Sequence, residues 1–379
     1  MDCKYHNSIE HLGEADVSRV SGDSLDFSYG MLYAIESSLP KGLIVRYCCV
    51  YDEDDLIAFV PVYIGTNVNI NALAPDFIER SYNVLLNIFG ESIGLKVAIA
   101  GCLISDKGFI PMDLSHKQSD MMSFIAQGVD QLCQQESVSL CVFKDMHESV
   151  YDNYRQALLK QSYFPAYSLP TIVIDNDFAS FSEYQASLTK NGRKHCKKTF
   201  RKAKESNLTL EVIDDFKDLN IEICALFRNT FVKAKYQFEE FSPHFFYSLA
   251  ESENPQTELI VCKNDGKIVG ALMNLYRHNQ VQLNKRIGMD YSQEDTGLIY
   301  MLLNYYGIKS AIEHGVKKIY LGQSTYIPKT RLGGYLEDQF LFMKTYSWLL
   351  RPSIALQRKF QYRYRKENVY KLLEQGVSL

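Results

Sequence analysis

Two stretches of the chain, one in each half, alternate apolar runs with short polar turns. Residues 43–64 contain two apolar runs separated by four acidic residues, and residues 257–276 contain two apolar runs separated by Asn264-Asp265-Gly266. Asn or Asp followed by Gly between two β-rich runs is a strong hairpin signal. The pattern therefore predicts one β-hairpin in each half of the chain.

The two predicted hairpins also resemble each other in sequence. Val50 aligns with Val261, Asp54 with Asp265 and Ile57 with Ile268, all at one constant offset. A repeat this long is not that of a solenoid, whose units span about 20–50 residues. We therefore expect two copies of one α/β unit.

Helices and strands alternate around both hairpins. In the first copy, the pattern predicts helices at 29–38, 79–89, 119–135 and 148–162 and strands at 95–100, 138–143 and 170–175. In the second copy, it predicts helices at 184–205 and 219–232, one starting at Ser242-Pro243 and one capped by Ser292 or Asp295 that reaches His314, with strands at 207–213, 280–288, 317–321 and 340–347. Ser180 with Glu183 makes a capping box before the first of these helices. The fold class is therefore α/β (α+β).

The overall composition is that of an ordinary globular protein. Hydrophobic residues make up 46% and charged residues 23%, and the net charge of −4 does not indicate nucleic-acid binding. The nine cysteines include no C-x-x-C spacing, which argues against a disulfide framework and a zinc ribbon. The sequence shows no signal-peptide pattern and no apolar run of about 18 residues. We expect a cytoplasmic protein with no transmembrane segment and no metal site.

Local charge differs from this balanced total. Residues 190–204 contain eight Lys and Arg and no acid, and residues 351–371 mix basic and aromatic residues with one acid. The first segment reads as a helix with one packed stripe surrounded by charge, which is either a solvated surface or a cradle for a phosphorylated ligand. Arg193, Lys194 and Lys197 lie near the start of that helix, so they are the expected anion contacts.

Three segments then follow one another in a characteristic order. They are the basic helix 188–203, the segment 286–291 with the Tyr-containing helix after it, and the strand-end segment 321–334, which carries Gly322-Gln323-Ser324 and Lys329. This order resembles that of the GNAT N-acyltransferase superfamily, in particular tandem FemAB-like aminoacyltransferases and BioF2-like acetyltransferase domains. The resemblance covers about residues 30–350.

The resemblance implies two tandem GNAT-like domains, each a mixed central sheet flanked by helices. The N-terminal GNAT-like domain would span 1–175 and the C-terminal, BioF2-like acyltransferase domain 176–350. A basic helical tail would follow at 351–379.

The resemblance also implies an N-acyltransferase. The expected donor is acyl-CoA, a co-substrate rather than a permanently bound cofactor, and the acceptor is an amino group of a small molecule, an amino sugar or a peptide. One alternative is a FemAB-like peptidyltransferase that uses aminoacyl-tRNA, in which case nucleic acid is a partner. Another is a non-catalytic polyanion-binding protein on the same scaffold.

One segment departs from the pattern of CoA-dependent GNAT enzymes. They hold the pyrophosphate with R/Q-x-x-G-x-G/A at a helix start, where backbone N–H groups bind the anion. Here residues 289–297 contain three acids and one Gly. A diphosphate would be repelled unless those acids point away.

The expected catalytic residues are Lys329, Tyr300 and Asp290. Lys329 follows a predicted strand, where loops line the ligand crevice, and would bind a donor phosphate or stabilise the oxyanion. Tyr300 would protonate the leaving group, or else is a core residue; Asp290 would deprotonate the amine through water, or else caps a turn. The expected substrate contacts are Arg193, Lys194, Lys197, Arg286, Gln323, Ser324, Tyr326, Arg331 and Gly333.

Overall fold

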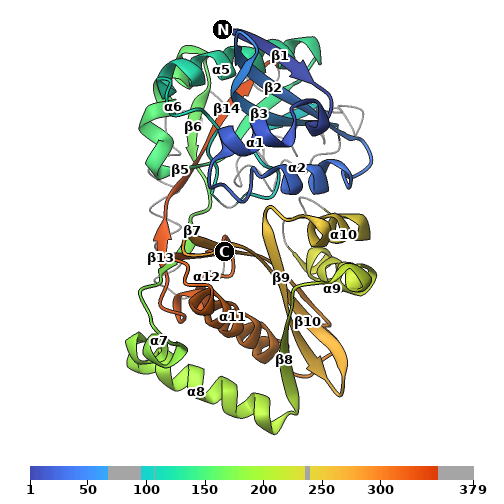
Figure 1. Ribbon diagram of the computed structural model, residues 1–379, viewed down its shortest axis with the longest axis vertical. Helices are drawn as coiled ribbons and strands as arrows, with labels where there is room; N and C mark the ends of the chain where they lie inside the picture. Colours follow the sequence, from blue (N-terminus) through green and yellow to red (C-terminus); the bar gives the residue numbers. More distant parts are fainter. Residues whose placement is uncertain (67–94, 106, 235–239, 349–379) are drawn as a thin grey trace. The chain divides into compact units, whose positions relative to one another are not determined.

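The computed structural model describes residues 1–66, 95–105, 107–234 and 240–348, which form two compact units (Figure 1). Unit 1 comprises Met1–Leu169 and the segment that begins at Asp338, and the described part of unit 2 comprises 170–234 and 240–337. The helix predicted at 79–89 and the tail predicted at 351–379 lie outside the described residues.

Unit 1 is built on a seven-stranded sheet in the order β1-β2-β3-β4-β5-β14-β6. Its strands are β1 (Asp2–His6), β2 (Leu43–Asp52), β3 (Asp55–Gly65), β4 (Val97–Ala100), β5 (Leu140–His147), β6 (Phe164–Tyr167) and β14 (Gln339–Thr345). Its described helices are η1 (Ile9–His11), α1 (Glu14–Ser21), α2 (Tyr29–Glu36), α5 (Gln118–Gln135) and α6 (Glu148–Lys160). The predicted hairpin at 43–64 is the β2–β3 pair.

Unit 2 is built on a second seven-stranded sheet, in the order β13-β7-β12-β11-β10-β9-β8. Its strands are β7 (Thr171–Asp175), β8 (Leu208–Ile213), β9 (Gln256–Asn264), β10 (Lys267–Arg277), β11 (Val281–Met289), β12 (Lys318–Gly322) and β13 (Tyr335–Glu337). Its described helices are α7 (Phe181–Ser187), α8 (Lys190–Glu205), η2 (Lys217–Leu219), α9 (Asn220–Lys233), α10 (Pro243–Glu251), α11 (Thr296–Glu313) and α12 (Tyr326–Thr330). The predicted hairpin at 257–276 is the β9–β10 pair.

The two sheets share one topology. Counted from β1 in unit 1 and from β8 in unit 2, the first four strands of each sheet pair antiparallel with their neighbours. The fourth strand then pairs in parallel with the fifth: β4 with β5 in unit 1, and β11 with β12 in unit 2. The predicted duplication of a mixed sheet flanked by helices is therefore confirmed.

Each of the two copies along the chain contributes one strand to the sheet of the other copy. β14 follows unit 2 in the chain but pairs with β5 and β6 of unit 1, whereas β7 follows unit 1 but pairs with β12 and β13 of unit 2. The sequence pattern predicts a strand of the first copy at 170–175 and a strand of the second copy at 340–347, and the pairing shows that both placements were wrong. An apolar run predicts a strand, but it does not say which sheet buries that strand.

The segment predicted as helical at 184–205, by the helix that the capping box opens or by its successor, forms two helices. α7 ends at Ser187, and α8 begins after Thr189, whose side-chain oxygen accepts a hydrogen bond from the backbone N–H of Gly192 at 3.1 Å. Such an N-cap satisfies one of the free N–H groups at a helix start. The basic residues therefore lie on a helix of their own.

α9 and α11 of unit 2 pack against opposite faces of its sheet. A Cβ atom added to Gly288 of β11 would lie 2.6 Å from the backbone nitrogen of Phe227 in α9. The neighbouring Ile287 and Met289 belong to a cluster with Ile299 and Leu303 of α11 instead. Because side chains alternate along a strand, β11 contacts a helix on each face.

Candidate functional site

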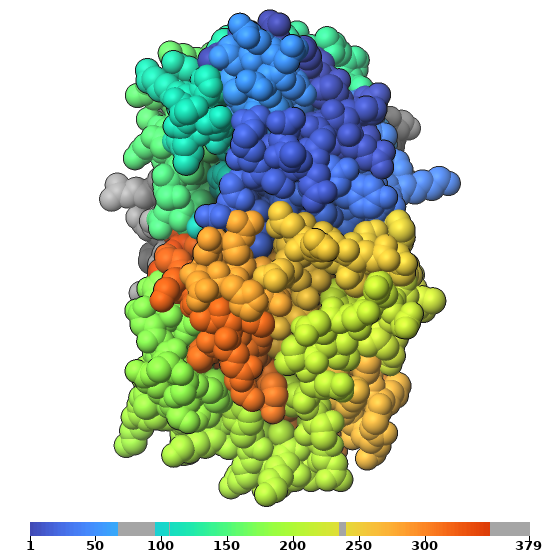
Figure 2. Space-filling model, in the orientation of Figure 1, coloured from blue at the N-terminus to red at the C-terminus, as the bar shows by residue number. Residues whose placement is uncertain are grey.

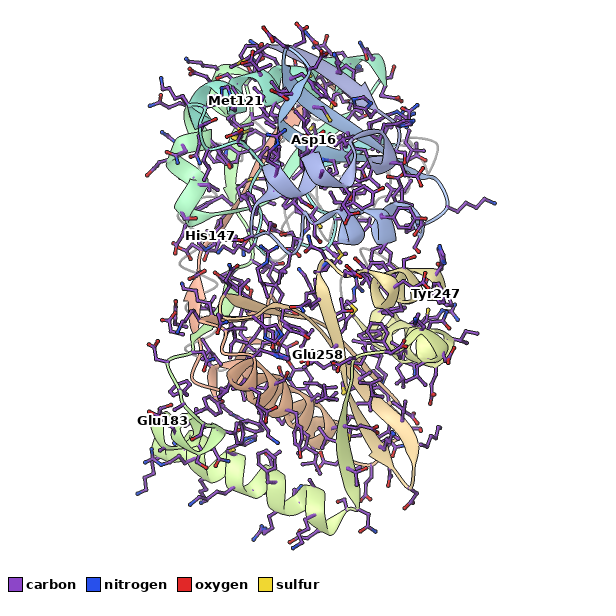
Figure 3. All side chains as sticks on the ribbon, viewed as in Figure 1. Asp16, Met121, His147, Glu183, Tyr247 and Glu258 are labelled. Atoms are coloured by element: carbon purple, nitrogen blue, oxygen red, sulfur yellow. The ribbon has the colours of Figure 1, made fainter. Side chains whose placement is uncertain are left out.

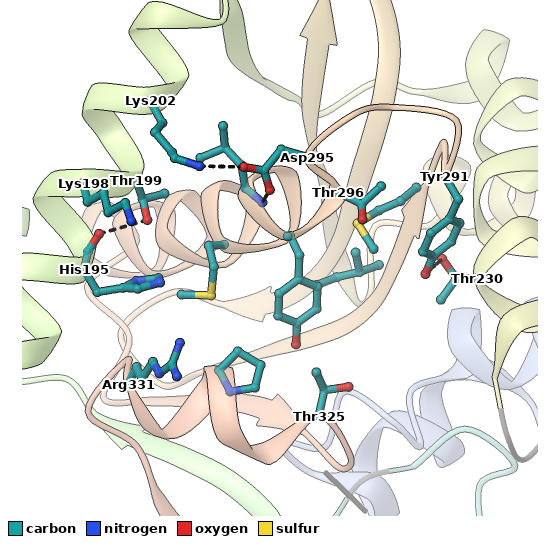
Figure 4. A pocket seen from close by; sticks show the side chains of 17 residues that line it. His195, Lys198, Thr199, Lys202, Thr230, Tyr291, Asp295, Thr296, Thr325 and Arg331 are labelled. Carbon is teal, nitrogen blue, oxygen red and sulfur yellow. Dashed lines mark hydrogen bonds and ion pairs between the residues drawn. The ribbon is translucent and has the colours of Figure 1, made fainter. Parts of the chain in front are cut away.

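A cavity of about 550 Å³ lies within unit 2, next to the start of α11 (Figure 4). Its lining comes from α8, α9, the end of β11, the first turns of α11 and the segment around α12. Apolar side chains share the wall with hydroxyl groups and with several cationic side chains, as is typical of ligand sites. The cavity is therefore the candidate site of this unit.

Divergence of two parallel strands makes room for this cavity. β11 pairs with β12 only from Val281 to Leu283, and an irregularity in its pairing with β10 leaves Lys285 as an extra residue just beyond. Such a bulge bends a strand. The residues after it, Ile287 and Met289, line the cavity.

One face of the basic helix α8 lines the cavity. The residues are His195, Lys198, Thr199 and Lys202, whose spacing of three and four places them on one side of a helix. Burial, then the positive charges of Arg331 and Lys198, lower the pKa of His195 below its usual value. The wall formed by α8 is therefore positively charged.

The structure does not bring the three expected α8 residues into this lining. Arg193 instead donates hydrogen bonds to the backbone carbonyls of Ala186 (3.0 Å) and Leu188, so it holds the end of α7. Lys194 and Lys197 are exposed. The prediction identified the basic helix but not the face that lines the cavity. Lys190, Arg201 and Lys204 of α8 are exposed as well, and the yellow-green segment that contains α8 lies at the surface of unit 2 (Figure 2).

A carboxylate occupies the N-terminus of α11. Asp295 is the N-cap residue, and its side chain accepts a hydrogen bond from the backbone N–H of Leu298 at 2.9 Å. Its other oxygen lies 2.9 Å from the ammonium of Lys202 on α8 (Figure 4). The hydrogen bond from Lys202, then that from the backbone, lowers the pKa of Asp295. An ionised carboxylate therefore lies where GNAT enzymes that use acetyl-CoA bind a pyrophosphate.

Tyr300 lies one turn into α11 and lines the cavity, as the sequence analysis expected. Its hydroxyl is buried beside the side chains of Thr325 and Asn304 and, among the described residues, meets no partner with regular hydrogen-bond geometry. Burial raises the pKa of Tyr300 well above its usual value. The hydroxyl group therefore keeps its proton near neutral pH and can donate it, or a hydrogen bond, to a group in the cavity.

Two of the expected substrate contacts, Arg331 and Gly333, lie in the segment after β12 and have different surroundings. Arg331 lines the cavity, and so do Thr325 and Pro328, which the sequence analysis did not name. Gly333 adopts φ +85° and has Leu188 of the α7–α8 junction 3.1 Å from the place of a Cβ atom. The absence of a side chain at Gly333 therefore lets this loop pack closely against Leu188.

Four other expected residues of this segment lie outside the cavity lining. Lys329 is buried, and its ammonium donates to the backbone carbonyl of Gln323 at 2.9 Å. Tyr326 is fully buried and donates to the carbonyl of Pro170 at 2.7 Å, and Ser324 is exposed. Gln323, the fourth, does not line the cavity either, and direct contact of these four residues with a ligand stays a prediction.

Asp290 and Arg286 also lie outside the cavity lining. Asp290 accepts hydrogen bonds from the backbone and side chain of Ser292, at 3.0 and 2.6 Å, and these lower its pKa to about 2. That is the turn-capping alternative, since a carboxylate with this pKa is a weak base. The guanidinium of Arg286 lies over the ring of Phe241, 5.0 Å from its centre.

In the part of the chain that the structure describes, no helix is both long and apolar enough to span a membrane. Within the same residues, no group of three His, Cys, Asp or Glu side chains is arranged to hold a metal ion.

A model of the FemAB-like family, described as peptidoglycan biosynthesis/recognition, matches residues 109–326, which is more than half of the chain. The match includes β5 and α6 of unit 1 and nearly all of the cavity-lining residues of unit 2. No curated protein sequence matches the chain.

Solved structures share the fold at low sequence identity. FemX is 12% identical with a TM-score of 0.58, covering 95% of this chain and 100% of that one. The C-terminal domain of a putative lysylphosphatidylglycerol synthetase from Agrobacterium fabrum is 12% identical with a TM-score of 0.53, covering 91% and 95%. A tandem GNAT protein from the clavulanic acid biosynthesis pathway is 8% identical with a TM-score of 0.50, covering 91% and 98%. The predicted resemblance to FemAB-like and tandem GNAT proteins is thus confirmed: the chain belongs to the FemAB-like family and shares the fold of these solved structures.

Proposed function

We propose that this protein transfers an aminoacyl group from aminoacyl-tRNA to an amine, with unit 2 as the donor-binding and catalytic unit. The observation that carries the proposal is the carboxylate of Asp295 at the N-terminus of α11. Acyl-CoA presents a diphosphate, which a carboxylate in that position repels. This favours a donor whose charge is spread along a chain of single phosphates.

The charge of the basic helix α8 also favours aminoacyl-tRNA as the donor. Lys190, Lys194, Lys197 and Lys204 are exposed on α8, outside the cavity but on the helix whose other face lines it. A row of exposed cations suits a nucleic-acid backbone, because each phosphate contact releases counterions. The cations within the cavity would then receive the end of the RNA.

The reaction requires positioning and two proton transfers. The amine attacks the carbonyl of the aminoacyl ester, a C–N bond forms and the C–O bond to the ribose breaks. The departing ribose oxygen needs a proton, which the buried hydroxyl of Tyr300 can supply. The proton that the amine loses passes through solvent water back to the phenolate oxygen of Tyr300, so the step is balanced. The cations of the α8 face and Arg331 hold the donor in place.

A direct comparison of donors tests the proposal. The purified chain is incubated with a mixture of labelled aminoacyl-tRNAs, or with labelled acetyl-CoA, and with amine acceptors that include a peptidoglycan stem peptide. We expect transfer from aminoacyl-tRNA that ribonuclease abolishes. Transfer from acetyl-CoA alone would support the second candidate, an acyl-CoA-dependent N-acyltransferase. Binding of tRNA with no transfer to any acceptor would support a polyanion-binding protein.

A further inference from the structure

The turn that joins β12 to α12 has an unusual backbone. Gly322, Ser324 and Thr325 all have positive φ angles, of +76°, +61° and +51°. Glycine adopts this region freely, but Ser and Thr adopt it at an energetic cost. Residues held in such conformations persist only where the surroundings impose them, and they cluster at functional sites.

Lys329 provides a restraint on this turn. Its side chain is only 6% exposed, and its ammonium donates to the backbone carbonyl of Gln323, which lies between the left-handed residues, at 2.9 Å. A buried charge is costly unless it is hydrogen-bonded. Lys329 is therefore fixed, and it fixes the peptide that precedes Ser324.

The restrained turn leads directly to the candidate site. Thr325 and Pro328 line the cavity, and the side chain of Thr325 lies beside the hydroxyl of Tyr300. Tyr326 anchors the same segment through its hydrogen bond to Pro170. A small change at Ser324 would therefore move the Thr325 hydroxyl away from Tyr300.

We infer that Lys329 is a positioning residue, which holds the left-handed turn 322–325 so that Thr325 orients the hydroxyl of Tyr300 for proton donation. The inference rests on the proposed function for the identity of the reaction. The restraint on the turn itself can be tested without turnover. Lys329 acts here through the backbone and does not contact the substrate.

The test compares Lys329→Met, Lys329→Arg and Lys309→Met by amide hydrogen exchange and by steady-state kinetics. Lys309 lies on the exposed side of α11 and pairs with Glu313, so its variant is the matched control. In Lys329→Met, we expect at least about tenfold faster exchange in the segment 323–326, with exchange in α11 unchanged. We also expect kcat to fall about tenfold or more while KM for the donor stays within about twofold. Lys329→Arg keeps a positively charged hydrogen-bond donor, so its exchange in 323–326 and its kcat should both lie closer to the wild-type values.

Unchanged exchange in Lys329→Met would overturn the inference, whether or not a donor has been found. A rise in donor KM at constant kcat would also overturn it, because that result indicates direct donor binding. If Lys329→Met does not fold, Ser324→Gly replaces it, since glycine loosens the turn without removing a buried charge. Ser324→Gly should show faster exchange and lower kcat; wild-type behaviour in both measurements would contradict the inference. Absence of turnover in the wild-type chain would count against the proposed function alone.

Discussion

The carboxylate of Asp295 lies 2.9 Å from the backbone nitrogen of Leu298, at the point where α11 begins. Free N–H groups at a helix start attract anions, so this position is a natural site for a phosphate. Here the chain supplies its own anion and neutralises it with Lys202. In the proposed reaction, the donor would therefore be recognised elsewhere in the cavity.

Replacing Asp295 should change which donors bind. Asp295→Ser keeps an N-cap oxygen but removes the negative charge, so we expect affinity for inorganic pyrophosphate and CoA to rise at least about tenfold. Calorimetry, or the shift in Tm on adding either compound, measures the gain. Asp290→Ser, which removes an acid of the same loop away from the helix start, should show no gain. If the wild-type chain already binds CoA as tightly as Asp295→Ser, the argument against a diphosphate donor fails.

Removing the hydroxyl of Tyr300 should slow the chemical step. We expect Tyr300→Phe to lower kcat by roughly 10- to 100-fold with little change in donor KM, because a proton donor is lost. Tyr306→Phe, on the same helix but outside the cavity lining, is the control. Equal rates for the wild type and Tyr300→Phe would assign the tyrosine to packing.

The pKa of Tyr300 also has a consequence for stability. Because burial raises it, the folded state favours the protonated form more than the unfolded state does. The resulting stabilisation is fully present below the ordinary tyrosine pKa of about 10 and is lost as pH rises through the folded-state value. The free energy of unfolding should therefore fall more steeply above about pH 10 in the wild type than in Tyr300→Phe.

The cavity face of α8 should govern binding of a polyanion. Lys198→Ala should weaken tRNA binding and reduce the slope of log affinity against log salt by about one, as expected for one lost phosphate contact. Lys309→Ala removes the same charge from the exposed side of α11 and should leave the slope unchanged. Equal slopes for both variants and the wild type would place the RNA on another surface.

Glu258 holds a buried polar cluster in unit 2, and its loss should destabilise the fold (Figure 3). It is 1% exposed and accepts hydrogen bonds from Ser310 (2.5 Å) and Asn274 (2.8 Å), with His314 at 3.0 Å. Glu258→Ala leaves these groups unpaired, so we expect a loss of about 3 kcal/mol in urea unfolding. Glu313→Ala, at an exposed site on α11, the helix that carries Ser310, should cost far less. A loss below about 1 kcal/mol in Glu258→Ala would contradict this account.

The pH dependence of this cluster follows from the pKa of Glu258. Burial alone would raise that pKa, but the hydrogen bonds from His314, Ser310 and Asn274 outweigh burial and lower it. The stabilisation is therefore present above the unfolded-state value of about 4.3 and is lost as pH falls through the folded-state value. Acid unfolding monitored by circular dichroism should show a shallower pH dependence below pH 5 in Glu258→Ala.

Local pattern was sufficient to predict most elements of the fold. Both hairpins were predictable because alternation and a turn signal lie within about 20 residues of each other. α12 and β13 span five and three residues, which is too short to show a period, and neither was predicted. The exchange of β7 and β14 was not predictable, since pairing depends on residues far away in the chain.

The candidate site was predictable only in part, for a similar reason. The composition of 190–204 predicted a basic helix, and its buried positions Cys196 and Ala203 mark the packed stripe. The face of α8 that lines the cavity depends on where α11 and α12 lie in the folded protein. The sequence of α8 alone does not contain that information. Asp295 was one of two predicted caps, but its partner Lys202 lies on another helix. Tyr300 and Arg331 both line the cavity, and both follow closely along the chain on the segments from which they were predicted.

Where β14 pairs determines when unit 1 can finish folding during synthesis. The strand lies between β5 and β6 in that sheet, yet it leaves the ribosome only after all of unit 2 has been made. At typical translation rates, the nascent sheet of unit 1 waits about ten to thirty seconds with the position between β5 and β6 unfilled. A premature stop codon just before β14 would therefore damage unit 1, although most of unit 1 precedes unit 2 in the chain.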